Sequence, residues 1–139
     1  MTAARIHRII PTPLDGDPVE CGALSLATCP PSLNNLFINS KRGRFKSPEY
    51  RAWQAKAGSQ IRRQCAWHVP GPITIALEFG RSQTKADLDN LIKPILDILM
   101  ATGRISDDRN VMRIDAQFVS GLAGTRIEIR RATAGKVAA

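Results

Sequence analysis

The chain has 139 residues, of which 43% are hydrophobic and 23% charged, a composition typical of one globular domain with its own core. The 20 lysines and arginines against 12 aspartates and glutamates give a net charge of +8, which favours a polyanionic partner. No apolar run reaches the roughly 18 residues of a membrane span, and the first 20 residues lack a signal peptide's apolar core. We therefore expect a cytoplasmic protein with no membrane partner.

The N-terminal third is expected to contain little regular structure. Residues 1–22 hold three prolines and no periodic pattern, which predicts an extension that is flexible or loosely docked. A short strand is predicted at about 23–29, ended by Pro30 and Pro31. The following stretch, "SLNNLFINSKRGRFKS", is interpreted as a polar loop. It carries a basic cluster made of Lys41, Arg42, Arg44 and Lys46. The three cysteines lack metal-site spacing, so we expect free thiols.

A helix is predicted to begin after Ser47. Its Ser-Pro-Glu start offers an N-cap hydroxyl, a proline whose missing N–H is harmless, and an acid favoured by the helix dipole. Apolar residues then recur at three- and four-residue steps, which predicts one buried face made of Tyr50, Trp53, Ala57, Ile61 and Cys65. Tyr50 and Trp53 are thus assigned to the core, whereas Trp67 or Phe45 could stack on an opened base. "HVPGP" at 68–72 is expected to end the helix.

The remaining chain alternates between strand and helix patterns. "ITIALEF" at 73–79 predicts a half-buried strand, and residues 88–100 predict a second helix closed by Gly103. "NVMRIDAQFV", with apolar positions from Met112 to Phe118, and "TRIEIR" are predicted to pair as an antiparallel hairpin. This order predicts an α+β fold, with a small mixed β-sheet and two main helices packed on it. The domain would span 23–131 and leave a C-terminal tail at 132–139.

The segment "KADLDNLIKPILDIL" at 85–99 places carboxylates beside an apolar run. Because Pro94 suits only the first turn of a helix, the helix should start near Asn90 or Leu91. Asp87 and Asp89 would then lie in an extended segment and point to the same side. Lys93 lies one turn beyond Asp89, and Asp97 is expected to be its solvated i,i+4 partner.

A second acidic pair, Asp107 and Asp108, precedes the strand that begins near Val111. If it converges with the first pair, two charges about 5 Å apart would repel by roughly 3 kcal/mol at an effective dielectric of about 20. A divalent cation relieves such repulsion, and hard oxygen ligands suit Mg²⁺ or Mn²⁺. The ion could polarise a phosphate and activate water, and Lys93 could stabilise the transition state. The alternative is a solvated acidic rim without metal.

Four motifs in this order resemble the RusA family of Holliday junction resolvases. They are "PPSLNNLF" followed by "KRGRFKSPEYRAW", then "DLDNLIKPILDIL", "GRISDDRNV" and the closing "RIEIR". The resemblance implies that Asp87, Asp89 and Asp108 ligate the metal and that Lys93 takes part in catalysis. It favours Asp108 over Asp107. Asn34 and Asn35 match a loop that either forms a turn or contacts DNA, and Asn90 is interpreted as a helix N-cap.

The resemblance further implies a function. The expected protein is a homodimeric, Mg²⁺-dependent endodeoxyribonuclease of bacterial or phage origin, which resolves four-way DNA junctions by paired symmetric nicks in recombination and repair. The basic cluster would bind phosphates, so DNA affinity should fall with salt. One alternative is a nuclease that acts on other branched DNA, such as flaps or forks. Another is a non-catalytic DNA-binding protein.

Overall fold

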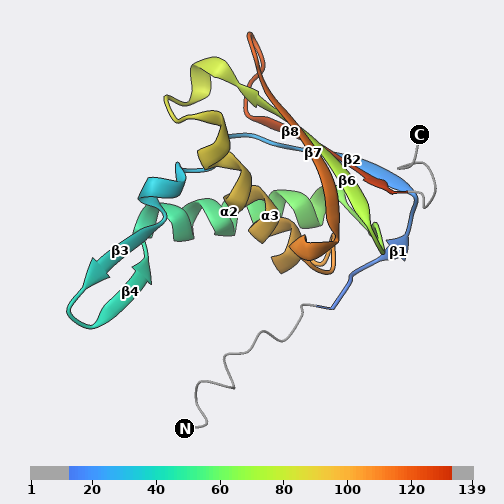
Figure 1. Ribbon diagram of the computed structural model, residues 1–139, viewed down its shortest axis with the longest axis horizontal. Coiled ribbons are helices and arrows are strands. Elements are labelled where there is room, and N and C mark those ends of the chain that lie inside the picture. The colour runs from blue at the N-terminus through green and yellow to red at the C-terminus, as the bar shows by residue number, and fades with distance from the viewer. Residues whose placement is uncertain (1–12, 133–139) are drawn as a thin grey trace, which may run out of the picture.

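The computed structural model describes residues 13–132 and contains two α-helices packed against one face of a four-stranded sheet (Figure 1). The predicted α+β class with a mixed sheet is confirmed. Two two-stranded sheets and short 3-10 turns complete the fold. In chain order the elements are β1 (Asp17–Pro18), β2 (Cys21–Leu26), η1 (Leu33–Asn35), β3 (Phe37–Ser40), β4 (Gly43–Lys46), α2 (Pro48–Gln64), β5 (Trp67–His68), β6 (Ile73–Gly80), η2 (Arg81–Gln83), η3 (Leu88–Leu91), α3 (Ile92–Ala101), η4 (Asp108–Asn110), β7 (Val111–Val119) and β8 (Thr125–Arg131).

Helix α2 begins where its capping sequence predicts. The Ser47 hydroxyl accepts a hydrogen bond from the backbone N–H of Tyr50, and Pro48 occupies the first turn. All five residues of the predicted apolar face are buried, which confirms the core roles of Tyr50 and Trp53. The helix ends at Gln64, before the predicted "HVPGP" stop, and β5 follows at Trp67.

The four-stranded sheet has the order β2-β8-β6-β7. Strand β6 is central and pairs antiparallel with β8 and parallel with β7. Its apolar side chains Ile73, Ile75, Leu77 and Phe79 are almost fully buried under the helices. The parallel β6–β7 pair needs a crossover, and α3 supplies it.

The predicted β7–β8 hairpin is wrong, because β6 lies between these two strands. The loop that joins them crosses over the end of β6, where the Gly80 N–H donates to the Gly124 carbonyl. A side chain at Gly80 would collide with the Leu122 carbonyl of that loop, so glycine permits the crossing. The predicted alternation also fails at Met112. A bulge near the start of β7 leaves Met112 exposed and pairs Val111 with Ile73.

The basic segment is a hairpin rather than the predicted loop. Strands β3 and β4 pair antiparallel and project from the body of the domain (Figure 1). The turn ends at Gly43, whose φ of +123° is a conformation that residues with a side chain rarely adopt. The turn contains none of the dipeptides that are typical of tight hairpins, such as Asn-Gly or Asp-Gly. A run of polar residues like this one is equally typical of a loop.

The start of the second helix differs in detail from the prediction. Asp87 is extended, with φ −73° and ψ 150°, but Asp89 lies inside the 3-10 turn η3. Asn90 is likewise inside this turn and is not the N-cap of α3, which is Leu91. Pro94 occupies the first turn of α3 as expected, and Gly103 follows the helix with φ +75°.

The described part of the N-terminal segment is docked on the body. Strand β1 pairs parallel with β5, and β2 begins at Cys21, two residues before the predicted strand. The predicted extension otherwise falls on residues 1–12, and most of the predicted tail on 133–139, which lie outside the described residues. All three cysteines are free, as expected. Between residues 13 and 132, no helix has the length and apolar character needed to cross a membrane.

Candidate functional site

Asp87 sits on the connection between β6 and α3. It precedes the 3-10 turn η3, and its side chain makes no capping hydrogen bond there. Asp87 and Asp89 are both exposed, and neither forms an ion pair within residues 13–132. The dipoles of the free N–H groups at a helix start favour negative charge nearby. The chain therefore presents two carboxylates whose oxygens are free to bind a ligand.

A cleft of about 580 Å³ joins Asp87 to the loop that carries Asn34 and Asn35. The structure thus brings together three side chains that the sequence analysis selected from distant segments. The polar and aromatic lining also includes residues from α2, from the segment before η3 and from η3 itself, namely Glu49, Trp53, Gln83, Thr84, Lys85 and Asn90. The cleft presents hydrogen-bond donors beside a free carboxylate, which is a suitable surface for a phosphodiester with a bound cation.

Ser47 connects this cleft to the basic hairpin. Its hydroxyl donates to the Asn35 carbonyl at 2.8 Å while it accepts from the Tyr50 N–H at 3.0 Å. The backbone N–H of Ser47 also donates to the Leu36 carbonyl at 2.8 Å. Both ends of the β3–β4 hairpin are therefore fixed beside the cleft wall.

Lys93 lies between two carboxylates. Its Nζ is 2.8 Å from Asp97 Oδ1 and 3.6 Å from Asp108 Oδ2. The hydrogen bond to Asp97, supplemented by the charge of Asp108, raises the pKa of Lys93 above its usual value. The predicted Lys93–Asp97 pair is confirmed, and Asp108 shares the same ammonium group. Lys93 therefore remains a cation at neutral pH.

The two adjacent acids of the second pair differ in their contacts. Asp107 caps the 3-10 turn η4, where its Oδ1 accepts from the Arg109 N–H at 2.9 Å. This hydrogen bond lowers the pKa of Asp107. Asp108 instead faces Lys93, and its backbone N–H lies 3.2 Å from the sulfur of Met100. Asp107 thus has a local structural task that Asp108 does not share.

The donor chemistry of these acids suits a hard divalent cation, but their arrangement does not gather three ligands. In the described part of the chain, no group of three or more His, Cys, Asp or Glu side chains is placed to hold a metal ion. Asp87 follows the C-terminal end of β6, whereas Asp108 precedes the N-terminal end of the parallel strand β7. The ligand set Asp87, Asp89 and Asp108 therefore remains a prediction.

The chain resembles known endonucleases over most of its length. The family model of endodeoxyribonuclease RusA matches residues 28–130. The chain belongs to the RusA family. It is also similar to the crossover junction endodeoxyribonuclease RusA of Aquifex aeolicus (strain VF5), with 29% identity over 115 residues, which cover 77% of this chain and 89% of the relative. The predicted family is thereby confirmed. The RusA match includes the cleft, the basic hairpin and both acidic pairs.

Several residues of the RusA-family cleft have no functional signal in the sequence. The Ser-Pro-Glu pattern predicts Glu49 only as a helix-start acid, yet Glu49 lines the cleft with Asp87 and Asn90. Trp53 is a core residue as expected, but it also forms part of the wall, and its buried indole N–H has no acceptor among residues 13–132. An unsatisfied buried donor costs about 1–3 kcal/mol.

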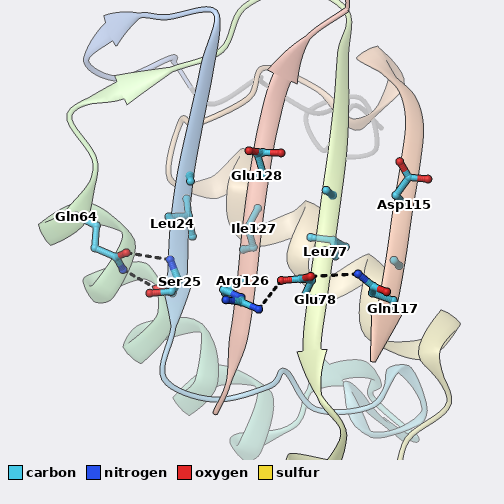
Figure 2. A pocket seen from close by; sticks show the side chains of 13 residues that line it. Leu24, Ser25, Gln64, Leu77, Glu78, Asp115, Gln117, Arg126, Ile127 and Glu128 are labelled. Carbon is cyan, nitrogen blue, oxygen red and sulfur yellow. Dashed lines mark hydrogen bonds and ion pairs between the residues drawn. The ribbon is translucent and has the colours of Figure 1, made fainter. Parts of the chain in front are cut away.

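A larger hollow of about 830 Å³ lies on the open face of the RusA-family sheet, away from the predicted site (Figure 2). Its charges are largely paired within the chain. Arg126 contacts Glu78 at 2.8 Å, and Glu78 accepts a hydrogen bond from Gln117 at 3.1 Å. None of the predicted site residues lines this hollow. The smaller cleft with the free carboxylate of Asp87 is therefore the better candidate site.

Proposed function

We propose that this chain is a Mg²⁺-dependent, structure-selective endodeoxyribonuclease that resolves Holliday junctions. The observation that carries the proposal is the Asp87 carboxylate, which has no ion-pair partner among residues 13–132 and lies in a cleft lined by amide and amine donors at the base of a basic hairpin. The name of the Aquifex relative, a crossover junction endodeoxyribonuclease, supports the choice of substrate.

The proposed roles follow from chemistry and position. The family resemblance assigns Mg²⁺, or Mn²⁺ in its place, to Asp87, Asp89 and Asp108, although the described residues do not gather these three carboxylates around one point. A bound ion would supply a Lewis acid that polarises the scissile phosphate and lowers the pKa of a water. Lys93, a cation whose pKa is raised further by its hydrogen bond to Asp97, would stabilise negative charge that develops on the phosphate. The neutral amides of Asn34, Asn35 and Asn90 would orient the DNA backbone without adding charge.

The DNA contacts outside the cleft come from the hairpin. The four basic residues are exposed on β4 and on the turn before it, namely Lys41, Arg42, Arg44 and Lys46. Phosphate neutralisation by these side chains would provide affinity that is independent of sequence and sensitive to salt. A four-way junction has two-fold symmetry, so paired nicks in opposing strands suit a C2 homodimer with two matched sites. We therefore propose a homodimer as the active species.

The test is the Asp87→Asn variant. We expect it to lower the rate of junction nicking in Mg²⁺ by a factor of about 100 or more, since a charged ligand becomes a neutral one. Binding to the junction in EDTA should persist or tighten, because one negative charge near phosphate is removed. Nicking would be measured on a labelled synthetic four-way junction, and binding by fluorescence anisotropy.

Asp115→Asn is the matched control. Asp115 is exposed on the open sheet face, where it pairs with Arg113 at 3.2 Å. Its replacement should leave both nicking and binding unchanged. If Asp87→Asn nicked junctions at the normal rate, the proposed site would be wrong. Faster cleavage of Y-shaped than of four-way DNA at fixed salt would instead move the proposal to forks or flaps.

A further inference from the structure

The β3–β4 hairpin carries an apolar pair as well as a basic cluster. Ile38 and Phe45 are opposite each other in the antiparallel register, so their side chains share one face of the hairpin. Each is 48% exposed. Two adjacent large apolar side chains that stay exposed to water do not gain the favourable free energy that their burial would provide. This arrangement needs an explanation other than folding.

The opposite face of the hairpin is occupied by contacts with the body. Phe37 packs edge-on against Tyr50, with ring centroids 6.0 Å apart, and Arg44 lies over the Phe37 ring at 4.2 Å. Lys46 lies 5.8 Å from the centre of the Tyr50 ring. Because neighbouring residues of a strand point to opposite faces, Ile38 and Phe45 are turned away from the helix. The apolar pair faces outward.

Charge identifies the kind of partner that can cover this pair. The segment 37–46 contains four basic and no acidic residues. Lys41 and Arg42 lie in the turn, whereas Arg44 and Lys46 lie on the face opposite to the apolar pair. A second copy of the chain docked on the apolar pair would bring two such basic hairpins together, which is repulsive. DNA combines phosphates for the cations with flat apolar base faces for Ile38 and Phe45. Nucleic acid therefore fits both properties of the hairpin at once.

We propose that Ile38 and Phe45 form an apolar wedge that stacks on a base at the branch point of the DNA. The proposal rests on the proposed function and identifies how its substrate is selected. Apolar side chains that enter a base stack must first unstack it, and this is least costly where bases are already unpaired or mismatched. The base pairs at a branch point have no continuous duplex on one side and are easier to open, whereas those of continuous duplex are stacked on both sides.

The root of the hairpin suits this task. Ser47 ties β4 to the Asn35 carbonyl and to the first turn of α2, so the wedge is held at a set position relative to the cleft. The sequence also predicts Trp67 as a residue that could stack on a base. Its ring instead lies against Gly22, where an added side chain would collide with it. Phe45 is thus the aromatic residue of the pair that can reach DNA.

The experiment uses a four-way junction with 2-aminopurine at the branch point, in EDTA so that no cleavage occurs. Wild-type binding should raise the fluorescence of the probe, because the base leaves its stack. The Ile38→Ala/Phe45→Ala double variant keeps all four cations. It should lose this rise and bind the junction about tenfold more weakly, while its affinity for linear duplex stays within about twofold.

Two further variants make the result specific. Met112→Ala removes another exposed apolar side chain, 56% exposed on β7, and should change neither signal. Phe45→Trp keeps an aromatic face and should retain the fluorescence rise. Thermal melting by circular dichroism would verify that each variant folds.

An undiminished fluorescence rise with the double variant would overturn the wedge, as would equal losses of affinity for junction and duplex. A change of the double variant's oligomeric state in light scattering would instead assign the pair to a contact between copies. These outcomes are separate from the fate of the nuclease proposal. If wild-type protein nicks junctions but the double variant shows no defect, only the wedge is wrong.

Discussion

At the scale of single residues, the small side chain of Ser47 connects two separate elements through two hydrogen bonds. One hydroxyl satisfies an N–H at the start of α2 and a carbonyl of the cleft loop. The sequence predicts the first contact, since an N-cap is a local feature of Ser-Pro-Glu. It does not predict the second, because Asn35 belongs to another element.

We therefore expect Ser47→Ala to lower the free energy of unfolding by about 1–2 kcal/mol, because both hydrogen bonds are lost from a buried position. Urea unfolding followed by circular dichroism measures this. Ser59→Ala, at an exposed position inside α2, should leave stability equal or slightly higher, since alanine is the better helix former. Equal losses in both variants would contradict the assigned role of Ser47.

At the scale of elements, local patterns predict α2, β6 and most of α3, but they do not predict strand neighbours. "NVMRIDAQFV" and "TRIEIR" both alternate, and a short glycine-containing loop separates them, which is typical of a hairpin. The deciding feature is the packing of that loop across Gly80, far away in the sequence. The same applies to the basic segment, whose strands are held by a turn at Gly43 rather than by an apolar pattern.

Two glycine substitutions should therefore have opposite effects on stability. Gly80→Ala places a methyl group against the backbone carbonyl of Leu122, and we expect a loss of about 1–3 kcal/mol. In Gly58→Ala, inside α2, the nearest neighbour of the added methyl group is the mobile end of Arg62 at 3.1 Å, and Ile98 and Thr102 lie at ordinary van der Waals distances. This variant should add about 0.5–1 kcal/mol through helix propensity. Thermal and urea unfolding of both variants measure the signs, and a stabilising Gly80→Ala would refute the crossing-loop account.

At the scale of the whole molecule, Arg104 joins three separated parts of the chain. Its side chain is fully buried. The guanidinium donates to the carbonyls of Cys65, Trp67 and Thr102, and it contacts Asp15 Oδ2 at 2.7 Å. This one side chain holds the N-terminal segment, the end of α2 and the end of α3 together. Nothing in the local sequence around Arg104 indicates these partners.

Replacement of Arg104 by methionine should lower the free energy of unfolding by about 3–5 kcal/mol, because several buried carbonyls lose their donor. Asp15→Asn should cost less than the Arg104 replacement, since Asp15 is largely exposed and an amide oxygen can still accept from the guanidinium. Chemical unfolding of the two variants gives the comparison. A larger effect from Asp15→Asn would show that the ion pair, and not the set of carbonyls, is the main contribution.

For the family and the candidate site, too, features that depend on neighbouring residues are predictable from the sequence, whereas features that depend on tertiary packing are not. The ordered motifs are sufficient to identify the RusA family, since they are read directly along the chain. The Lys93–Asp97 pair follows from helical spacing. The joint lining of one cleft by Asn34, Asn35 and Asp87 follows only from the packing of the cleft loop against η3.

Strand β2 is an edge strand of the sheet, and contacts along its outer edge determine whether a strand of another copy can pair there. Side-chain amides of α2 take the place of a further strand along its outer edge. Gln64 bonds both the N–H and the carbonyl of Ser25 (Figure 2), and Gln60 accepts from the N–H of Ala27. Backbone groups that are already bonded cannot template another chain. Extension of the sheet by a strand of another copy is thus hindered at Ser25 and Ala27 of this edge.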